Sequence, residues 1–208
     1  NSSNFYVSIS HSDRSEELDY VATVYNGLHT EEFTYRAQPK DYLLFFGRIH
    51  PEKGTHEAIQ IAKQSGRKLI ISGLIQDQQY FANKIKPFLD DPDITYTGNS
   101  GPKERDILLG EAYALLHPIS FEEPFGLSVA ESMLCGTPVI AYNKGSMKEL
   151  IRHGETGFLV DTIDEAVEAV NDIKSIDRKF CRTYATAKFS RQTMIEGYIE
   201  VYRWILEK

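Results

Sequence analysis

Short apolar segments that alternate with amphipathic ones constrain the fold of this chain more than any other feature. The apolar segments are rich in β-formers and mostly continuous, as in strands that are covered on both faces. We expect strands at residues 5–9, 21–25, 42–46, 68–72, 94–97, 114–117, 138–142 and 158–160. Helical patterns occupy residues 55–64, 103–113, 127–135, 164–173 and 190–208. This alternation predicts an α/β fold, with a doubly wound, mostly parallel sheet and helices on both of its faces.

The most linker-like stretch is residues 30–40, and we place a domain boundary there. Residues 41–208 are expected to form one domain, whereas residues 1–40 are too short for a domain and are interpreted as the remnant of a preceding one plus its linker. The last helix favours packing onto the domain over binding of a partner, because its apolar side chains share one face. They are Met194, Tyr198, Val201, Tyr202 and Ile205.

Charge and cysteine content exclude several classes of protein. The 208 residues include 23 Lys and Arg against 30 Asp and Glu, a net charge of −7, which argues against nucleic acid and anionic membranes as partners. No apolar run is long enough to be a transmembrane segment. Cys135 and Cys181 lie in no metal or redox spacing. These observations predict a soluble, cytoplasmic protein.

In a parallel sheet, ligands bind outside the carboxyl ends of the strands, so the loops at that edge are the candidates. The loop after strand 42–46 contains Gly47, Arg48 and Lys53. Two cations five residues apart can converge on one anion, with bidentate geometry from the guanidinium and a point charge from the ammonium. The alternative interpretation is that Arg48 and Lys53 are solvated loop charges paired to Glu52, and the sequence leaves this alternative open.

The strongest local signal is the pair Glu123 and Glu131, which seven residues separate. Glu123 lies on the loop after strand 114–117, and Glu131 falls in the second turn of the next helix. Gly126 permits close approach of a ligand to the backbone, and the first amides of that helix suit a phosphate. A carboxylate is also a good acceptor for a ribose diol. The alternative, two surface charges, is disfavoured because the helix is otherwise apolar.

Weaker candidates follow two other strands. Gly73 ends strand 68–72, and Gly98 and Asn99 follow strand 94–97, where backbone groups can meet a nucleobase; a plain turn is the favoured interpretation at each place. Four histidines are candidate catalytic groups, but we expect loop or core roles for them, with His50 the one most favoured to touch a ligand. They are His11, His50, His117 and His153.

Several motifs together carry a family resemblance. In chain order they are Gly47-Arg48…Lys53-Gly54, Ile70–Gly73, Thr95–Gly98, Glu123-Pro-Phe-Gly…Glu131 with its tail Gly-Thr-Pro-Val-Ile-Ala, and Gly154-Glu-Thr-Gly-Phe. From about residue 42 to the end, the chain resembles the C-terminal, nucleotide-sugar-binding domain of retaining glycosyltransferases of family 4, which has a Rossmann-like GT-B fold. The first 40 residues are similar to the end of that family's N-terminal domain, which implies that an acceptor-binding domain precedes Asn1.

The resemblance implies a role for each matching residue. Arg48 and Lys53 would contact the diphosphate, Glu123 the donor sugar, and Glu131 the ribose. The remaining donor-binding positions would be Gly47, Gly73, Gly98, Asn99, and the amides of Phe125, Gly126 and Leu127. Residues 118–122 are longer than the family's usual Pro-Ser form, which leaves the sugar pocket there undetermined.

The implied function is hexosyl transfer in carbohydrate biosynthesis, with a UDP-sugar as the favoured donor and GDP-mannose second. The family needs no metal and no other cofactor, and the acceptor domain is expected in cis or in trans. A free-standing nucleotide-sugar-binding subunit of a split transferase is one alternative, and a non-catalytic sensor is another. A Rossmann oxidoreductase is disfavoured because no G-x-G-x-x-G follows any strand.

Overall fold

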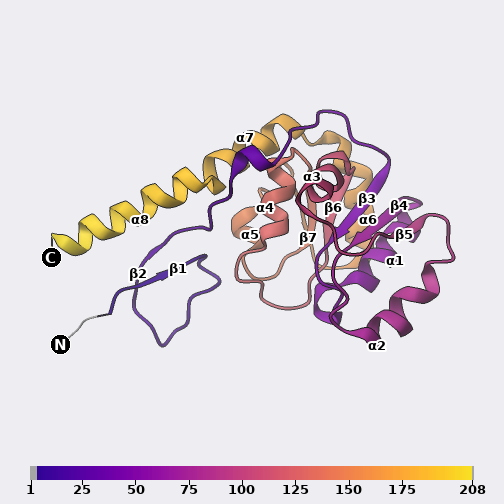
Figure 1. Cartoon of the computed structure of the whole chain (residues 1–208), viewed down its shortest axis with the longest axis horizontal. Helices are drawn as coiled ribbons and strands as arrows, with labels where there is room; N and C mark the ends of the chain where they lie inside the picture. Colours follow the sequence, from indigo (N-terminus) through magenta and orange to yellow (C-terminus); the bar gives the residue numbers. More distant parts are fainter. Residues whose placement is uncertain (1–3, 208) are drawn as a thin grey trace.

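A six-stranded parallel sheet forms the centre of the computed structural model, which describes residues 4–207 (Figure 1). Its order is β5-β4-β3-β6-β7-β8, and every neighbouring pair is parallel. The strands are β3 (Tyr42–Phe46), β4 (Lys68–Ser72), β5 (Ile94–Tyr96), β6 (Ala114–His117), β7 (Val139–Tyr142) and β8 (Gly157–Val160). All six were expected, with ends that differ by at most one residue. The chain grows outward from β3 to β5 and then returns to place β6 beside β3, so the strand order reverses between these two strands.

Helices cover both faces of the sheet, which confirms the doubly wound α/β fold. α1 (Thr55–Ser65) and α6 (Ile163–Asp172) share a buried cluster on one face. α3 (Pro102–Glu111), α4 (Leu127–Leu134), α5 (Met147–Leu150) and α7 (Arg178–Phe189) contribute to the cluster on the other face. The sequence did not predict α5, α7 or the helical turns from α2 (Gln78–Tyr80) to residue 88. Within residues 4–207, no helix combines the length and apolar character needed to cross a membrane.

Strand β3 shows why the apolar segments are continuous. Leu43 and Phe45 point into the cluster under α1 and α6, whereas Tyr42 and Leu44 point into the cluster under α4 and α7. Successive side chains of a strand alternate between faces, so both sets of positions must be apolar when both faces are covered. Each fully buried side chain of this kind stabilises the fold by roughly 1.5–3 kcal/mol.

Residues 30–40 are packed against the domain despite their linker-like composition. After a short 3₁₀ turn at Thr30–Glu32, Phe33 is buried in the cluster that contains α4 and α7. Arg36 forms an ion pair of 2.9 Å with Asp106 of α3, and the N–H of Thr34 donates to the same carboxylate. Composition does not reveal these contacts because they are made with residues about 70 positions away.

The expected packing of the last helix onto the sheet domain is wrong. α8 (Arg191–Leu206) runs away from the six-stranded sheet beside β1 (Tyr6–Ser8) and β2 (Tyr20–Thr23), which pair only with each other among the described strands (Figure 1). Of the residues of α8, only Val201 is buried, and Tyr202 is 60% exposed. Helical periodicity shows that one face is apolar but not which layer covers that face.

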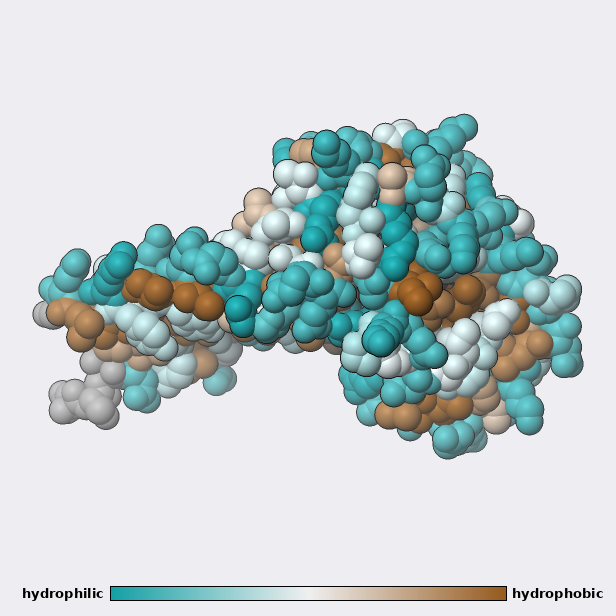
Figure 2. Space-filling model, turned by 45° about the horizontal axis from the view of Figure 1, so that its top comes forward, coloured by the Kyte–Doolittle hydropathy of each residue, from teal (hydrophilic) through white to brown (hydrophobic). Residues whose placement is uncertain are grey.

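The apolar face of α8 meets the N-terminal segment and solvent. A Cβ on Gly197 would lie 3.1 Å from the Val24 side chain, so the backbones of α8 and residue 24 approach closely. Phe5 packs edge-on against Trp204, with 6.1 Å between ring centroids. Figure 2 shows the hydrophobic side chains that remain on the surface of this arm, and the exposed ones include Ile195, Ile199 and Leu206.

Gly54 joins the turn that carries Lys53 to the start of α1, and its substitution tests how tightly that turn is held. It has a φ of +74°, and an added Cβ would lie 1.9 Å from the carbonyl oxygen of Pro118. We expect Gly54→Ala to lower the free energy of unfolding by about 3 kcal/mol or more, since strain and a backbone clash add. Urea denaturation measures this change.

Gly66→Ala is the matched control. Gly66 has a similar φ of +64°, but no atom in the described part of the chain lies within 4 Å of an added Cβ. Only the left-handed strain is then introduced, which costs about 1 kcal/mol. Equal destabilisation by the two variants would show that the turn moves freely away from Pro118.

Candidate functional site

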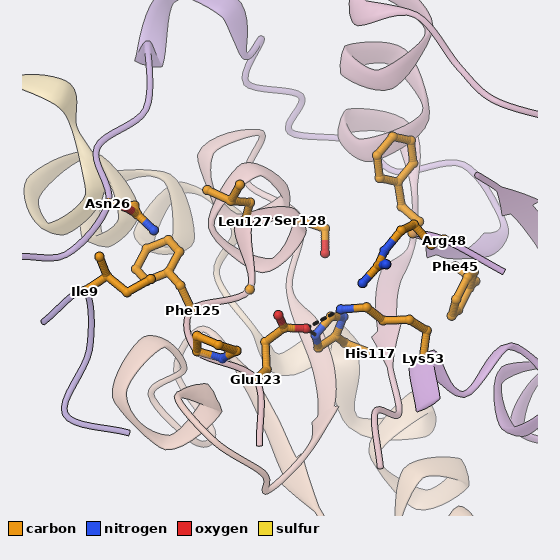
Figure 3. A pocket seen from close by; sticks show the side chains of 14 residues that line it. Ile9, Asn26, Phe45, Arg48, Lys53, His117, Glu123, Phe125, Leu127 and Ser128 are labelled. Atoms are coloured by element: carbon orange, nitrogen blue, oxygen red, sulfur yellow. Dashed lines mark hydrogen bonds and ion pairs between the residues drawn. The ribbon is translucent and has the colours of Figure 1, made fainter. Parts of the chain in front are cut away.

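A cavity of about 360 Å³ opens at the carboxyl ends of β3 and β6, where the strand order reverses (Figure 3). One wall comes from the end of β3 and the loop after it, and another from the segment between β6 and α4. The N-terminal segment supplies the remaining part of the wall, through Ile9 and Asn26. The lining residues are Ile9, Asn26, Phe45–Arg48, Lys53, His117 and Glu123–Ser128. This is the position where ligands bind in open parallel sheets.

Lys53 and Glu123 form a nearly buried ion pair at the base of this cavity. The Lys53 Nζ lies 2.5 Å from Glu123 Oε2, and both side chains are only 14% exposed. The Lys53 ammonium also lies 4.6 Å from the centroid of the Phe121 ring. Lys53 is therefore not a solvated loop charge, and its partner is not Glu52. The Glu52 carboxylate lies instead 3.6 Å from His50 Nδ1.

Arg48, in the same loop as Lys53, also lines this cavity. The residue is exposed, and its Nη1 donates a 2.7 Å hydrogen bond to Gln76. Figure 3 shows the guanidinium of Arg48 and the ammonium of Lys53 both directed at the centre of the cavity. The structure thus brings the two predicted cations to one cavity, as convergence on a single anion requires.

The start of α4 supplies a third source of positive potential. Gly126 has a φ of +86°, which a residue with a Cβ rarely adopts, and the helix begins at Leu127. Leu127 and Ser128 line the cavity, so the unpaired first amides and the positive end of the helix dipole lie at its wall. Glu123, Phe125, Gly126 and Leu127 all line the cavity as well. An anion placed here would meet two side-chain cations and a helix N-terminus.

Glu131 lies one turn deeper in α4 and is only 7% exposed. Its Oε1 accepts a 3.0 Å hydrogen bond from Arg105 of α3, which is the partner that a buried carboxylate requires. Burial raises the pKa of Glu131 to about 6, with a contribution from Glu32, and Arg105 opposes this shift. Glu131 is not among the residues that line the 360 Å³ cavity.

Arg105 was not identified from the sequence. It binds Glu131 through one guanidinium nitrogen and Glu32 through another, and it stacks over the Phe33 ring. No local pattern marks it, because its partners lie on α4 and in the linker. Its Nε is buried without a hydrogen-bond partner among residues 4–207.

The predicted glycines lie in a row at the same edge of the sheet. The N–H of Gly47 donates to the Ser72 carbonyl at 3.0 Å, and the N–H of Gly73 donates to the Gly98 carbonyl at 2.8 Å. These bonds join the loops that follow β3, β4 and β5. Of these glycines, Gly47 lines the cavity, whereas Gly73, Gly98 and the adjacent Asn99 lie beyond its rim.

The histidines divide between turns and the cavity. His50 does not line the cavity, and its Nδ1 accepts the N–H of Glu52 within the turn. His11 and His153 also lie outside it. His117 is buried, in line with the expected core role, but it lines the cavity too, and its Nε2 lies 3.8 Å from Glu123 Oε2. Ile9 and Asn26 complete the wall and were not predicted as site residues.

Comparison with known proteins identifies the family of this chain. Residues 30–188 match the family of glycosyl transferases group 1. The chain belongs to this family. It is 28% identical over 176 residues to a 2-deoxystreptamine N-acetyl-D-glucosaminyltransferase of Niallia circulans, covering 78% of this chain and 45% of that protein. It is 27% identical over 203 residues to a glycogen synthase of Mycobacterium tuberculosis, covering 89% and 49%.

The chain spans about half the length of the curated relatives that it matches. Among solved structures, it is similar to AviGT4, a glycosyltransferase involved in avilamycin A biosynthesis, with a TM-score of 0.82 and 25% identity. That match covers 97% of this chain and 64% of AviGT4. The Anabaena protein HepE, solved with UDP and glucose, shares the fold with a TM-score of 0.80 at 20% identity, over 95% of this chain and 62% of HepE.

Removal of one member of the buried ion pair should destabilise this group 1 domain. We expect Lys53→Met to lower the free energy of unfolding by about 3 kcal/mol, because it leaves the Glu123 carboxylate in the cavity wall without its countercharge. The double variant Lys53→Met/Glu123→Gln should recover much of that loss. Urea denaturation of the three proteins measures the effect.

Lys63→Met provides the control, since Lys63 forms a 2.7 Å ion pair with Asp91 but is 45% exposed. Exposed pairs of this kind contribute little to stability, so we expect a far smaller change. A loss for Lys53→Met as small as that for Lys63→Met would mean that water reaches the cavity pair freely.

Proposed function

We propose that this chain is the donor-binding half of a retaining glycosyltransferase, which transfers a hexose from a nucleotide diphosphate sugar to an acceptor hydroxyl. The observation that carries the proposal is the convergence of Arg48, Lys53 and the N-terminus of α4 on one cavity. Two cations and a helix N-terminus suit a diphosphate, and Glu123 at the same cavity suits sugar hydroxyls.

The difficult step is the departure of the nucleoside diphosphate from the sugar. The bond between the sugar carbon and the phosphate oxygen breaks with its electron pair, so negative charge grows on the diphosphate. Arg48 and Lys53 would neutralise this charge, and groups placed in advance cost little reorganisation at that moment. We propose that these side chains and the helix amides supply the charge stabilisation without a metal ion. Nucleotide binding that a chelator leaves unchanged would agree with this.

The ribose and base would lie next to the cavity, against groups that do not line it. Glu131, held by Arg105, would accept hydrogen bonds from the ribose hydroxyls, and the row of loops at Gly73, Gly98 and Asn99 would flank the base. We propose a UDP-sugar as donor, which the HepE complexes with UDP and with UDP-glucose support. GDP-mannose is second, because a GDP-mannose-dependent mannosyltransferase of Dictyostelium discoideum is 28% identical over 137 residues.

The acceptor would be held by a separate N-terminal domain, in cis or in trans. The chain spans about half of its curated relatives, and β1, β2 and one face of α8 lie outside the six-stranded sheet domain. These elements are well placed to continue into a second domain that closes over the cavity, whose wall already includes Ile9 and Asn26.

Calorimetric titration with UDP, GDP and ADP, and then with their sugars, tests the donor site. We expect UDP to bind, and Arg48→Ala and Lys53→Ala each to weaken binding about tenfold or more, since each removes a charge-assisted hydrogen bond. Lys63→Ala, on α1 outside the cavity, should bind UDP like the unmodified chain. In a complete enzyme, the two cavity variants should each lower the rate about 10²-fold. No binding of any nucleotide at millimolar concentration would overturn the proposal.

Nucleotide-sugar binding should also depend on pH through Glu131. Its pKa is about 6, and only the ionised carboxylate is a strong acceptor for the ribose hydroxyls. The ionised fraction falls as the pH drops through 6, so we expect UDP-glucose affinity to fall by up to about tenfold between pH 7 and pH 5.

Glu131→Gln should bind more weakly at pH 7 and lose this dependence on pH. UDP-glucose is the better probe than UDP here, because its diphosphate is esterified at both ends and does not titrate in this range. An unchanged pH profile in Glu131→Gln would assign the titration to another group.

A further inference from the structure

His117 presents an unpaired nitrogen to the cavity. It is the last residue of β6 and only 5% exposed, and its Nε2 is buried without a hydrogen-bond partner among the described residues. Buried polar atoms are almost always paired, so an unpaired one in a cavity wall calls for an explanation. The nearest charged group is Glu123, whose Oε2 lies 3.8 Å from Nε2, and Figure 3 shows the ring beside the Lys53–Glu123 pair.

The ring is neutral at physiological pH. Burial, together with the charge of Lys53, lowers the pKa of His117 to about 3. A neutral imidazole carries one N–H, and an ionised carboxylate can only accept a hydrogen bond. The nitrogen that faces Glu123 is therefore best placed as an N–H donor. At 3.8 Å it is about 1 Å too far for a normal N–H···O hydrogen bond.

Lys53 already donates to the same carboxylate oxygen that His117 faces. Its ammonium contacts Glu123 Oε2 at 2.5 Å, so this oxygen has both a hydrogen-bond donor and a countercharge. A diphosphate in the cavity would compete for Lys53. Glu123 would then be left as a nearly buried charge, which is costly unless another donor replaces the ammonium.

We propose that His117 is a positioning residue for Glu123: its Nε2–H donates to the Glu123 carboxylate when Lys53 turns to the donor diphosphate. The exchange keeps Glu123 ionised and aimed at the sugar hydroxyls while the charge of Lys53 serves the leaving group. His117 does not touch the diphosphate in this arrangement, and it acts on the sugar through Glu123. The inference rests on the proposed function, because it assumes a nucleotide sugar in the cavity.

Three variants separate this role from a structural one. His117→Met keeps a similar volume without a donor, His117→Gln offers an amide N–H, and His153→Gln changes a histidine outside the cavity. Affinities are measured at pH 8 by calorimetry for UDP-glucose and for UDP, which lacks the sugar. We expect His117→Met to weaken UDP-glucose binding about tenfold and UDP binding by clearly less, because either diphosphate draws Lys53 from Glu123 but only UDP-glucose also uses the carboxylate for its sugar. His117→Gln should recover most of the loss, and His153→Gln should behave like the unmodified chain.

The outcomes distinguish the two proposals. If the unmodified chain binds neither UDP nor UDP-glucose, the proposed function fails and the role of His117 fails with it. If it binds both, and His117→Met weakens them equally or not at all, only the role of His117 is overturned. In a Glu123→Gln background, His117→Met should have no further effect, and an additive loss would also count against a role exerted through Glu123.

A spectroscopic measurement on the unmodified chain keeps the inference testable if His117→Met fails to fold. Nitrogen-15 NMR of the imidazole should show a neutral ring protonated at Nε2, and addition of UDP-glucose should shift this N–H downfield as it hydrogen-bonds the carboxylate. A ring protonated at Nδ1, or an Nε2 signal that the sugar nucleotide leaves unchanged, would overturn the proposal.

Discussion

The reversal of strand order between β3 and β6 is the constraint on which the rest of this molecule depends. Parallel strands joined by right-handed crossovers put all their carboxyl ends at one edge, and the reversal separates the two connecting helices there. The loops after β3 and β6 then lie side by side, with Gly54 against Pro118. Lys53 and Glu123 consequently meet although they are 70 residues apart in the chain. Without that juxtaposition, each would be an isolated loop charge.

The second theme is local charge in an acidic protein. A net charge of −7 argues against polyanions as general partners but says nothing of a cavity lined by Arg48, Lys53 and a helix N-terminus. Low exposure makes each charge depend on its neighbours, so Glu123 holds Lys53 in the cavity and Arg105 holds Glu131 outside it. Such pairs keep the binding groups ordered before a ligand arrives, and a ligand of the right charge can exchange for one partner.

The N-terminal segment is attached to the sheet domain by a few specific contacts. Glu149 of α5 accepts 2.8 Å hydrogen bonds from the N–H groups of His11 and Ser12, and another from the hydroxyl of Tyr25. Burial and the Glu149 charge raise the pKa of that hydroxyl to about 12, so it stays a donor. These bonds hold the segment that brings Ile9 to the cavity. A short stretch outside the main sheet thereby becomes part of the candidate site.

The sequence by itself determined the sheet, the helices α1, α3, α4, α6 and α8, and the main candidate residues of the cavity, because strand and helix periods and Gly-rich turns are local signals. It missed α7, whose only clear local mark is the cap at Asp177, and it placed the apolar face of α8 on the wrong layer. Only the tertiary structure decided which charges are partners: Lys53 pairs with Glu123 rather than Glu52, and Glu131 pairs with Arg105. It also placed His117, whose Nε2 has no hydrogen-bond partner among the described residues, beside the Lys53–Glu123 pair. The reason is physical, since such pairings depend on which strand ends lie next to each other in space, and no local period records that order.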